Sequence, residues 1–342
     1  MIDSRSPIRG IFTPNMVPLD SEGRINEAEL ARYIEWLIQK GVHGLYPNGS
    51  TGEFTRFSAD ERKRIVKIVC EVSNGRVPIL AGAAEANIRE TLIACERYAE
   101  YGARAVAVIS PIFYKLGQES IFAYFKEIAE QSVIDVTVYN IPMLSTPIDL
   151  NTIERLSAYE RIIGIKDSSG DVGLMTQMIS RIRPQRPEFA FMTGWEAVLV
   201  PMLAAGADGG TNASSGVVPE VTRRLFDLFH EGDLKESMTI QYRLTDLFER
   251  LLRGADFPEG FRTGVEIRGF EMGSSRQPLS GDQQIDRSEL KRMLHCLIAD
   301  FDLVDRPQYC ESSSKLPTSS DRAAKEIARQ VAKELSITSD PE

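Results

Sequence analysis

Residues 26–47, NEAELARYIEWLIQKGVHGLYP, contain the unit that decides the fold: an amphipathic helix pattern followed by a short apolar strand pattern. Within 30–38 the apolar residues recur at i, i+3, i+4, i+7 and i+8, which places them on one face of a helix. Lys40 and Gly41, a cation and a C-cap glycine, then mark the end of that helix.

The same alternation of strand and helix continues along the chain. Short runs rich in β-branched residues predict eight strands, at 9–13, 44–47, 77–81, 105–110, 136–139, 162–166, 189–193 and 208–211. Amphipathic helices are predicted between them, for example at 58–72, where Ser58 and Glu61 form a capping box, and at 86–101.

Eight strand–helix units predict an α/β fold of the (β/α)8 TIM barrel type. A doubly wound open sheet has the same alternation. Two observations favour the barrel: the eight units fit within about 230 residues, the usual barrel size, and no G-x-G-x-x-G follows the first strand.

Beyond residue 219 only helical patterns follow, at 221–230, 234–252, 259–270 and 287–301. We therefore expect residues 1–230 to form the barrel and 231–302 a C-terminal helical extension. Residues 303–342 read as a serine-rich linker and a short terminal helix.

Composition excludes several classes of protein. With 342 residues, 42% hydrophobic and 26% charged, the chain is typical of a globular protein and long enough to bury a large core. A net charge of −9 argues against nucleic acid or an anionic membrane as a partner. The sequence has neither an apolar signal run at its start nor the roughly 18 consecutive apolar residues of a membrane span.

Cysteine and histidine are few and scattered. No two cysteines show a paired spacing, so we expect reduced thiols and a cytoplasmic protein. The cysteines are Cys70, Cys95, Cys296 and Cys310. We interpret the histidines as structural and expect no metal site. They are His43, His230 and His295.

Two residues at predicted strand ends are candidates for catalysis, because the active site of such a barrel lies at the carboxyl ends of its strands. Lys166 ends an apolar strand, where burial would lower its pKa and free the amine to attack a carbonyl. The alternative is a lysine that reaches solvent or pairs with Asp167. Tyr139 can move a proton to or from a substrate oxygen, or can be a core tyrosine.

Two loops are candidates for substrate binding. Gly49, Ser50 and Thr51 follow the second strand, where backbone N–H groups and two hydroxyls can hold a carboxylate or phosphate. Thr211 and Asn212 lie at the eighth strand, where barrels often bind phosphate. The alternative interpretation of both loops is that their small residues only allow close packing of the backbone.

Together these motifs resemble the dihydrodipicolinate synthase / N-acetylneuraminate lyase family of class I, Schiff-base-forming pyruvate aldolases, over about residues 7–300. The motifs occur in order at predicted strand ends, as Thr-Pro at 13–14, Gly-Ser-Thr-Gly-Glu at 49–53, Tyr-Asn-Ile-Pro at 139–142, Gly-Ile-Lys-Asp-Ser-Ser-Gly at 164–170 and Gly-Ala-Asp-Gly-Gly at 206–210.

The resemblance implies a role for each motif. Lys166 is expected to form a Schiff base with the keto carbon of pyruvate or another 2-oxo acid. Ser50 and Thr51 are expected to bind the carboxylate, and Tyr139 to shuttle the proton. The protonated imine is itself the electron sink, so the resemblance implies neither a metal nor an organic cofactor. It also implies a homotetramer built as a dimer of dimers.

Departures from the family pattern bear on the substrate. The synthases carry an arginine where this chain has Leu144, which argues against an acidic aldehyde partner. Gly194 and Glu196 follow the seventh strand, where the lyases hold a sugar tail. Phe113 aligns with a relay tyrosine that reaches across a subunit interface, and Tyr114 is the candidate replacement.

The sequence therefore predicts a pyruvate-releasing aldolase or lyase that acts on a 2-keto-3-deoxy sugar acid or an N-acetylneuraminate-like substrate. A dehydratase of 2-keto-3-deoxy acids and a dihydrodipicolinate synthase-like condensation are alternatives that use the same Schiff base. A paralogue that binds 2-oxo acids without turnover is a third.

Overall fold

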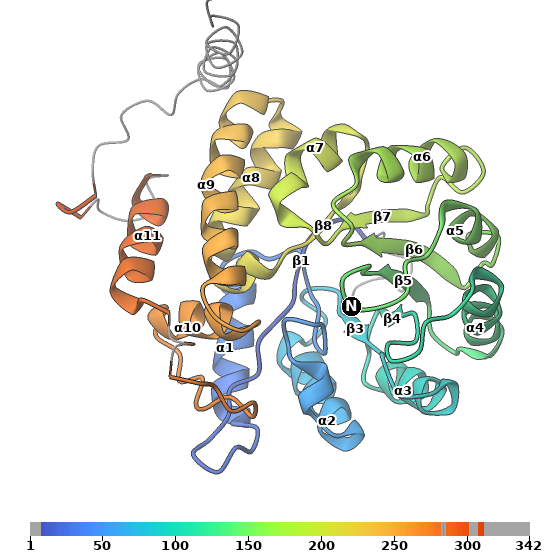
Figure 1. The fold of residues 1–342 in the computed structure, drawn as a ribbon, viewed down its shortest axis with the longest axis horizontal. Coiled ribbons are helices and arrows are strands. Elements are labelled where there is room, and N and C mark those ends of the chain that lie inside the picture. The colour runs from blue at the N-terminus through green and yellow to red at the C-terminus, as the bar shows by residue number, and fades with distance from the viewer. Residues whose placement is uncertain (1–7, 282, 284, 301–306, 311–342) are drawn as a thin grey trace, which may run out of the picture. The chain divides into compact units, whose positions relative to one another are not determined.

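The structure is a computed structural model that describes residues 8–281, 283, 285–300 and 307–310. Eight strands alternate with helices (Figure 1) and confirm the eight predicted strands, with differences only at their ends. The strands are β1 (Gly10–Thr13), β2 (Gly44–Leu45), β3 (Leu80–Gly82), β4 (Ala105–Ile109), β5 (Val136–Asn140), β6 (Ile162–Asp167), β7 (Ala190–Thr193) and β8 (Gly209–Thr211).

All strand pairs are parallel, in the order β2-β1-β8-β7-β6-β5-β4-β3. A further parallel bridge between Leu45 and Ile79 joins the two ends of this order, and the Leu45 N–H donates to the Pro78 carbonyl at 3.1 Å. The sheet therefore closes on itself and confirms the predicted (β/α)8 TIM barrel.

The helices follow the strands and continue beyond the barrel. They are α1 (Glu27–Gln39), α2 (Ala59–Ser73), α3 (Ile88–Glu100), α4 (Gln118–Gln131), α5 (Leu150–Leu156), α6 (Val172–Ile182), α7 (Leu199–Ala204), α8 (Pro219–Glu231), α9 (Leu234–Arg253), α10 (Glu259–Ile267) and α11 (Arg287–Asp300). In the described part of the chain, none is long and apolar enough to cross a membrane.

Local sequence features set the helix boundaries. The predicted capping box is confirmed, since the Glu61 N–H donates to Ser58 Oγ and the Ser58 N–H donates back to the Glu61 carboxylate. Gly41, with a φ of 81°, follows α1 in the left-handed conformation that a C-terminal glycine permits.

The barrel interior is filled by side chains and is not a pore. Phe12, Leu80 and Met192 come from three different strands and Tyr46 directly follows β2. All four are almost fully buried and pack in one apolar cluster. A filled interior leaves the two rims of the barrel as the places where a ligand can bind.

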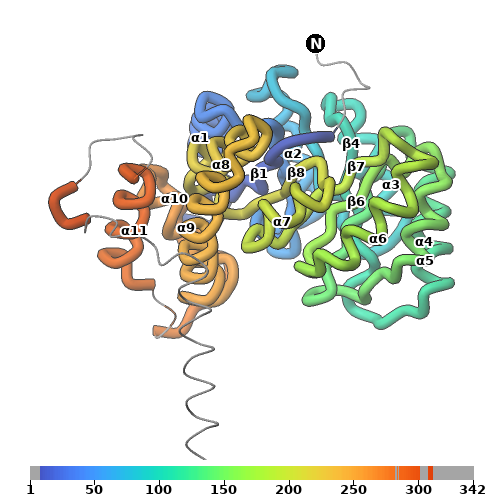
Figure 2. The backbone as a smooth tube through the Cα atoms, turned by 90° about the horizontal axis from the view of Figure 1, so that it is seen from above, coloured from blue at the N-terminus to red at the C-terminus, as the bar shows by residue number. Residues whose placement is uncertain are grey.

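The chain divides into two compact units, Met1–Leu294 and His295–Glu342. Within the first, Figures 1 and 2 both show α9 lying beside α8. The predicted terminal helix at 321–336 lies outside the described residues.

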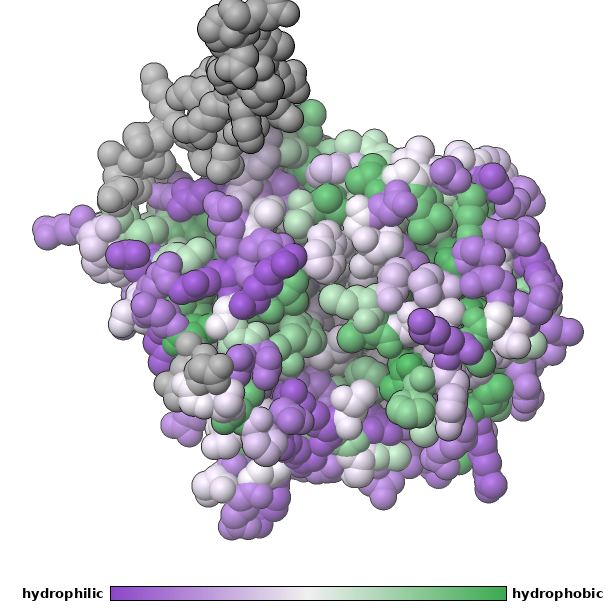
Figure 3. Space-filling view, in the orientation of Figure 1, coloured by the Kyte–Doolittle hydropathy of each residue, from purple (hydrophilic) through white to green (hydrophobic). Residues whose placement is uncertain are grey.

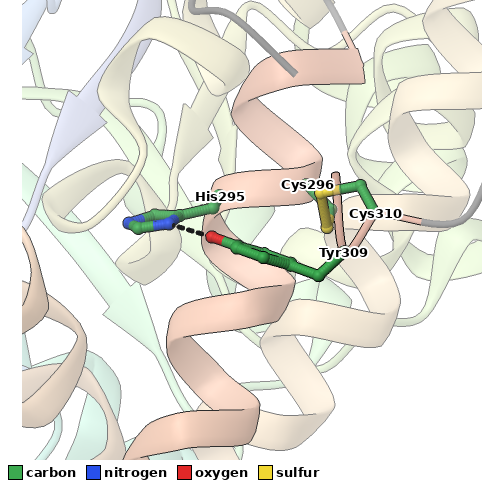
Figure 4. The surroundings of a disulfide bond; sticks show 4 residues. All are labelled: His295, Cys296, Tyr309 and Cys310. Atoms are coloured by element: carbon green, nitrogen blue, oxygen red, sulfur yellow. Dashed lines mark hydrogen bonds between the residues drawn. A yellow bond between two sulfur atoms is a disulfide. The ribbon is translucent and has the colours of Figure 1, made fainter. Parts of the chain in front are cut away.

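The expectation of four reduced cysteines is wrong for two of them. Cys296 and Cys310 form a disulfide, with their Cα atoms 5.4 Å apart (Figure 4). A separation of 14 residues matches no disulfide motif in sequence. The pairing is seen only in the fold, which brings the two Cα atoms within disulfide distance. Cys70 and Cys95 are free and buried, and burial raises their pKa values to about 12 and 11.

Candidate active site

Lys166 lies at the carboxyl end of β6 and is only 5% exposed. The register of the barrel pairs it with Tyr139 on β5 and with Met192 on β7. Its Nζ lies 4.0 Å from the ring centroid of Tyr139 and 4.5 Å from that of Tyr46. Burial lowers the pKa of Lys166 and outweighs the opposing effects of Tyr139 and Glu196.

The alternative in which Lys166 pairs with its neighbour finds no support. The Asp167 carboxylate is buried and accepts hydrogen bonds from Asn140 Nδ2, at 2.6 Å, and from Ser169 Oγ, at 2.5 Å. Burial raises the pKa of Asp167. No ion pair joins it to Lys166 in the described part of the chain, so the amine faces the rings of two tyrosines instead.

Tyr139 connects the lysine to the loop after β2. Its hydroxyl lies 3.4 Å from Ser50 Oγ, and Thr51 beside it is buried. Gly49 permits this turn, since a Cβ there would lie 2.6 Å from the Tyr46 ring. The lysine, the phenol and the two hydroxyls predicted from separate motifs are therefore brought to one place.

These residues line a cavity of about 400 Å³ at the carboxyl ends of the strands. Its wall includes Lys166, Tyr139, Ser50, Thr51, Thr211, Ser168, Gly194, Trp195, Pro14, Ala213, Ile141, Met143, Leu144, Phe248, Leu252, Arg253 and Phe257. Its polar groups come from strand ends and the loops that follow them, except for Arg253 at the end of α9, and most of the apolar ones come from later loops and from α9. Such a cavity, with a few convergent polar groups, is the usual form of a small-molecule site.

A larger cavity, of about 670 Å³, lies at the amino ends of the strands, and we do not assign the chemistry to it. Five of its charged residues are paired with one another: Asp135 accepts from Arg104 at 2.6 Å and from Arg161 at 3.0 Å, and Arg186 pairs with Glu188 at 2.5 Å. Active sites of these barrels lie at the opposite rim.

Gly194 is required by the packing around Lys166. Its N–H donates to the Asp167 carbonyl at 2.7 Å, which holds the end of β7 against β6. A Cβ at this position would lie 1.9 Å from Ser168 Oγ and 2.8 Å from Lys166 Cε. Gly194 therefore lines the cavity, and a glycine is needed there because the lysine stem approaches it closely.

Glu196 is placed differently from Gly194. It is buried and is not among the residues that line the cavity. Its carboxylate accepts hydrogen bonds from the Ser214 N–H, at 3.0 and 3.2 Å, and from the Ser214 hydroxyl. Burial raises the pKa of Glu196 to about 7, against the smaller lowering effect of Ser214.

The eighth strand contributes buried polar groups without partners. Thr211 lines the cavity, and its Oγ1 has no hydrogen-bond partner among the described residues. The side-chain amide of Asn212 likewise has none, but Asn212 does not line the cavity. A buried hydroxyl is costly to leave unpaired, so Thr211 Oγ1 is suited to accept or donate a bond to a ligand.

The predicted relay residue lies away from the cavity of its own chain. Tyr114 is 74% exposed and Phe113 86%, and their rings contact each other with centroids 5.0 Å apart. Neither lines the cavity, whereas Leu144 does, at its rim.

A buried ion pair joins the Ser50–Thr51 loop to the C-terminal extension. Glu53, with a φ of 57°, accepts from Arg262 Nη1 at 2.8 Å, and both side chains are 3% exposed. Arg262 also donates to the carbonyls of Val17 and Met272. An ion pair between residues 209 positions apart gives no signal in the sequence.

Sequence reasoning missed Tyr46 as well. It follows β2 and presents its ring to the Lys166 amine, in the same way as Tyr139 at the end of β5. An aromatic residue at a strand end was the available signal. For metals, no group of three or more His, Cys, Asp or Glu side chains is positioned to hold an ion in the part of the chain that the structure describes.

Known proteins share both the sequence and the fold. The profile of the Dihydrodipicolinate synthetase family matches residues 7–297. A 4-hydroxy-tetrahydrodipicolinate synthase of Acidiphilium cryptum is 31% identical over 82% of this chain and 96% of its own. An uncharacterised DapA-like lyase of Halobacterium salinarum is 30% identical over 83% of this chain and 92% of its own.

A solved structure gives the same result. A prophage protein of the dihydrodipicolinic acid synthase family from E. coli K12, in complex with pyruvate, superposes with a TM-score of 0.79 at 26% identity. The match covers 87% of this chain and all of the other. The family resemblance read from the motifs is therefore confirmed, and the chain belongs to the dihydrodipicolinate synthetase family.

Proposed function

We propose that this protein is a class I lyase that cleaves or forms a carbon–carbon bond in a 2-oxo acid through a Schiff base, with pyruvate as one product or substrate. The observation that carries the proposal is the buried Lys166 amine, 4.0 Å from the Tyr139 ring at the floor of a cavity. Family membership supports it, because relatives are named as synthases and lyases and one neighbour was solved with pyruvate.

Substrate binding and imine formation use the polar residues that line the cavity. Ser50 and Thr51 hold the substrate carboxylate with hydroxyl and N–H donors. The Lys166 amine, whose pKa burial lowers, adds to the C2 carbonyl. Tyr139 protonates the carbonyl oxygen, which leaves as water when the carbinolamine becomes an imine.

Bond cleavage then uses the imine as the electron sink. The C4 hydroxyl gives up its proton to the Tyr139 phenolate, the C3–C4 bond breaks, and its electron pair moves through C3 to the imine nitrogen. The aldehyde leaves and an enamine remains. Protonation at C3 and addition of water to the imine release pyruvate and restore the free Lys166 amine, so the cycle balances without a cofactor.

We propose a homotetramer in which a second copy supplies Tyr114 to this site. Exposed apolar side chains support the assembly, since Ile112, Phe113 and Tyr114 on one loop and Met143 on the next are each at least 47% exposed. Figure 3 shows hydrophobic residues (green) at several places among hydrophilic ones (purple) on the face in view. Replacing Tyr114 with Phe should lower kcat while sedimentation still gives the parent mass; an unchanged kcat would remove Tyr114 from the relay.

Borohydride trapping tests the Schiff base directly. With pyruvate and borohydride, we expect one reduced adduct, located at Lys166 by peptide mass spectrometry. Lys166→Ala should give no adduct and no turnover while keeping the parent melting temperature, and Lys126→Ala on exposed α4 is the matched control. No adduct on the parent protein would overturn the proposal and leave a binding protein without turnover.

One further readout separates the two reactions that share this imine. Cleavage releases pyruvate in step with the loss of substrate, whereas dehydration consumes a 2-keto-3-deoxy acid without releasing pyruvate. We expect pyruvate release.

A further inference from the structure

We propose that the aldehyde that joins or leaves pyruvate at this site carries an aromatic or branched hydrocarbon group, in place of hydroxyls or a second acidic group. This inference rests on the proposed function, because it concerns the half of the substrate that lies beyond the imine carbon. It differs from the sugar acid that the sequence pattern predicts.

The cavity has a polar end and an apolar end. Lys166, Tyr139, Ser50 and Thr51 form the polar end, where the carboxylate and the keto carbon bind. With those two groups fixed, the substituent at C4 extends away from the strand ends toward the rest of the wall. That part of the wall is formed by Ile141, Leu144, Trp195, Phe248, Leu252 and Phe257.

The apolar end is held in place before any ligand binds. The rings of Trp195 and Phe248 meet edge to face at 5.4 Å, and Phe257 packs against Phe261 at 6.0 Å. Gln241 fixes α9 against the first turn of α7 and the residues just before it, by donating to the Glu196 carbonyl at 2.9 Å and accepting from the Val200 N–H. A preformed aromatic wall binds a flat or branched apolar group with little loss of entropy.

A polyhydroxylated aldehyde finds few partners at this end. The carboxylate that would accept hydrogen bonds from sugar hydroxyls, Glu196, is engaged by Ser214 and does not line the cavity. The residue before Ser214 that does line it is Ala213. Hydroxyls that are buried against apolar side chains without partners cost free energy, so the wall selects against a sugar.

An aldehyde with a second carboxylate is also disfavoured. Among the described residues of the wall, Arg253 is the one cation besides Lys166. Its Nε lies 2.6 Å from Glu249 Oε2, so a carboxylate partner already balances its charge. An incoming carboxylate would have to displace Glu249 at a site that is open to solvent, where ion pairs contribute little.

The test is a competition among aldehydes in the condensation direction. The protein and pyruvate are incubated with benzaldehyde, 3-methylbutanal, D-glyceraldehyde, N-acetylmannosamine or succinic semialdehyde. C3 of the enamine bonds to the aldehyde carbon and the aldehyde oxygen takes up a proton, so the 4-hydroxy-2-oxo acid contains every atom of both reactants. Mass spectrometry measures this product. We expect kcat/KM for the two apolar aldehydes to exceed that for the other three by about tenfold or more.

Two variants test whether the wall sets this preference. Phe257→Ser and Leu144→Ser change exposed wall positions, and Tyr242→Ser changes an exposed residue of α9 that does not line the cavity. We expect both wall variants to lower the ratio of kcat/KM for benzaldehyde to that for glyceraldehyde by about tenfold. Tyr242→Ser should leave the ratio as in the parent, and melting temperatures show whether each variant is folded.

The outcomes separate this inference from the proposed function. Absence of a borohydride-trapped pyruvate adduct overturns the Schiff-base mechanism itself. An intact adduct together with a preference for glyceraldehyde, N-acetylmannosamine or succinic semialdehyde overturns only the apolar substrate. If the wall variants lower the mass of the assembly but leave the benzaldehyde-to-glyceraldehyde ratio of kcat/KM unchanged, the wall is a subunit interface. That result also overturns the apolar substrate.

Discussion

Gly194→Ala should nearly abolish catalysis while leaving the barrel folded. The added Cβ would lie 2.8 Å from Lys166 Cε, whereas ordinary contacts lie at 3.4–4 Å, so the lysine stem must recede by about 0.6 to 1.2 Å. A displacement of that size at a reacting group costs about 100-fold in rate. The Ser168 hydroxyl, 1.9 Å from the new Cβ, must also rotate away, and such overpacking costs about 1–3 kcal/mol of stability.

Steady-state kinetics and thermal unfolding separate these two effects. We expect kcat/KM to fall by about 100-fold while the melting temperature falls by only a few degrees. Gly117→Ala is the matched control, because a Cβ there has nothing within 4 Å and its φ is −73°. If Gly194→Ala kept kcat/KM within about threefold of the parent, the position of the lysine stem would not limit the rate and the reasoning would be refuted.

Four further predictions follow from the same site. The rate of pyruvate trapping should rise with pH and level off below pH 10.5, the ordinary lysine value, because burial lowers the pKa of Lys166; a plateau only above that pH would contradict this. The folded Glu196 has a pKa of about 7 against an ordinary 4.5, so the folded state binds the extra proton and the free energy of unfolding falls as pH rises between those values. In the parent, the free energy of unfolding should therefore be lower at pH 8 than at pH 5 by an amount on the order of 3 kcal/mol, and Glu196→Gln should remove this difference. Denaturant unfolding at the two pH values measures it, and an equal difference in parent and variant would refute the prediction. Thr211→Val should stabilise the free protein by about 1 kcal/mol and raise the KM for pyruvate, because it removes an unpaired buried hydroxyl; a lower melting temperature would show that the hydroxyl is satisfied. Arg262→Met should cost about 3 kcal/mol, because it removes the more deeply buried of the two arginines that pair with the Glu53 carboxylate and leaves Arg56 as its one charged partner among the described residues; an unchanged denaturation midpoint would count against the pair.

The sequence was sufficient to predict the barrel and to predict that Lys166, Tyr139 and the Ser50–Thr51 loop meet at one rim of it. Lys166 and Tyr139 end neighbouring parallel strands, and closure of a barrel brings such ends to one rim whatever the details of packing. The Ser50–Thr51 loop follows β2 and arrives at the same rim for the same reason.

Features that depend on tertiary packing could not be predicted. Phe248 lies in α9, and an apolar residue in an amphipathic helix looks the same whether it packs on a core or lines a cavity. Phe257 lies in the turn between α9 and α10, where only the fold shows that it lines the cavity. Glu196 stands where a substrate ligand was expected, but the direction of its carboxylate depends on Ser214, eighteen residues later. The Cys296–Cys310 pairing depends likewise on how the chain folds back.

The helical extension supplies residues that we propose select the aldehyde, whereas the barrel supplies the residues that we propose form the Schiff base. These two properties can therefore change independently in evolution. A chain ending after α8 would contain every strand, and with them Lys166, Tyr139 and Ser50, yet it would lack the Phe248 and Phe257 of the wall and the arginine that holds Glu53. Under the function proposed above, substitutions on the cavity side of α9 are therefore expected to alter which aldehyde is accepted without moving Lys166. Replacing α9 and α10 with the corresponding helices of a relative should likewise change the preferred aldehyde while keeping the residues of the barrel, provided that the arginine at position 262 in α10 is retained.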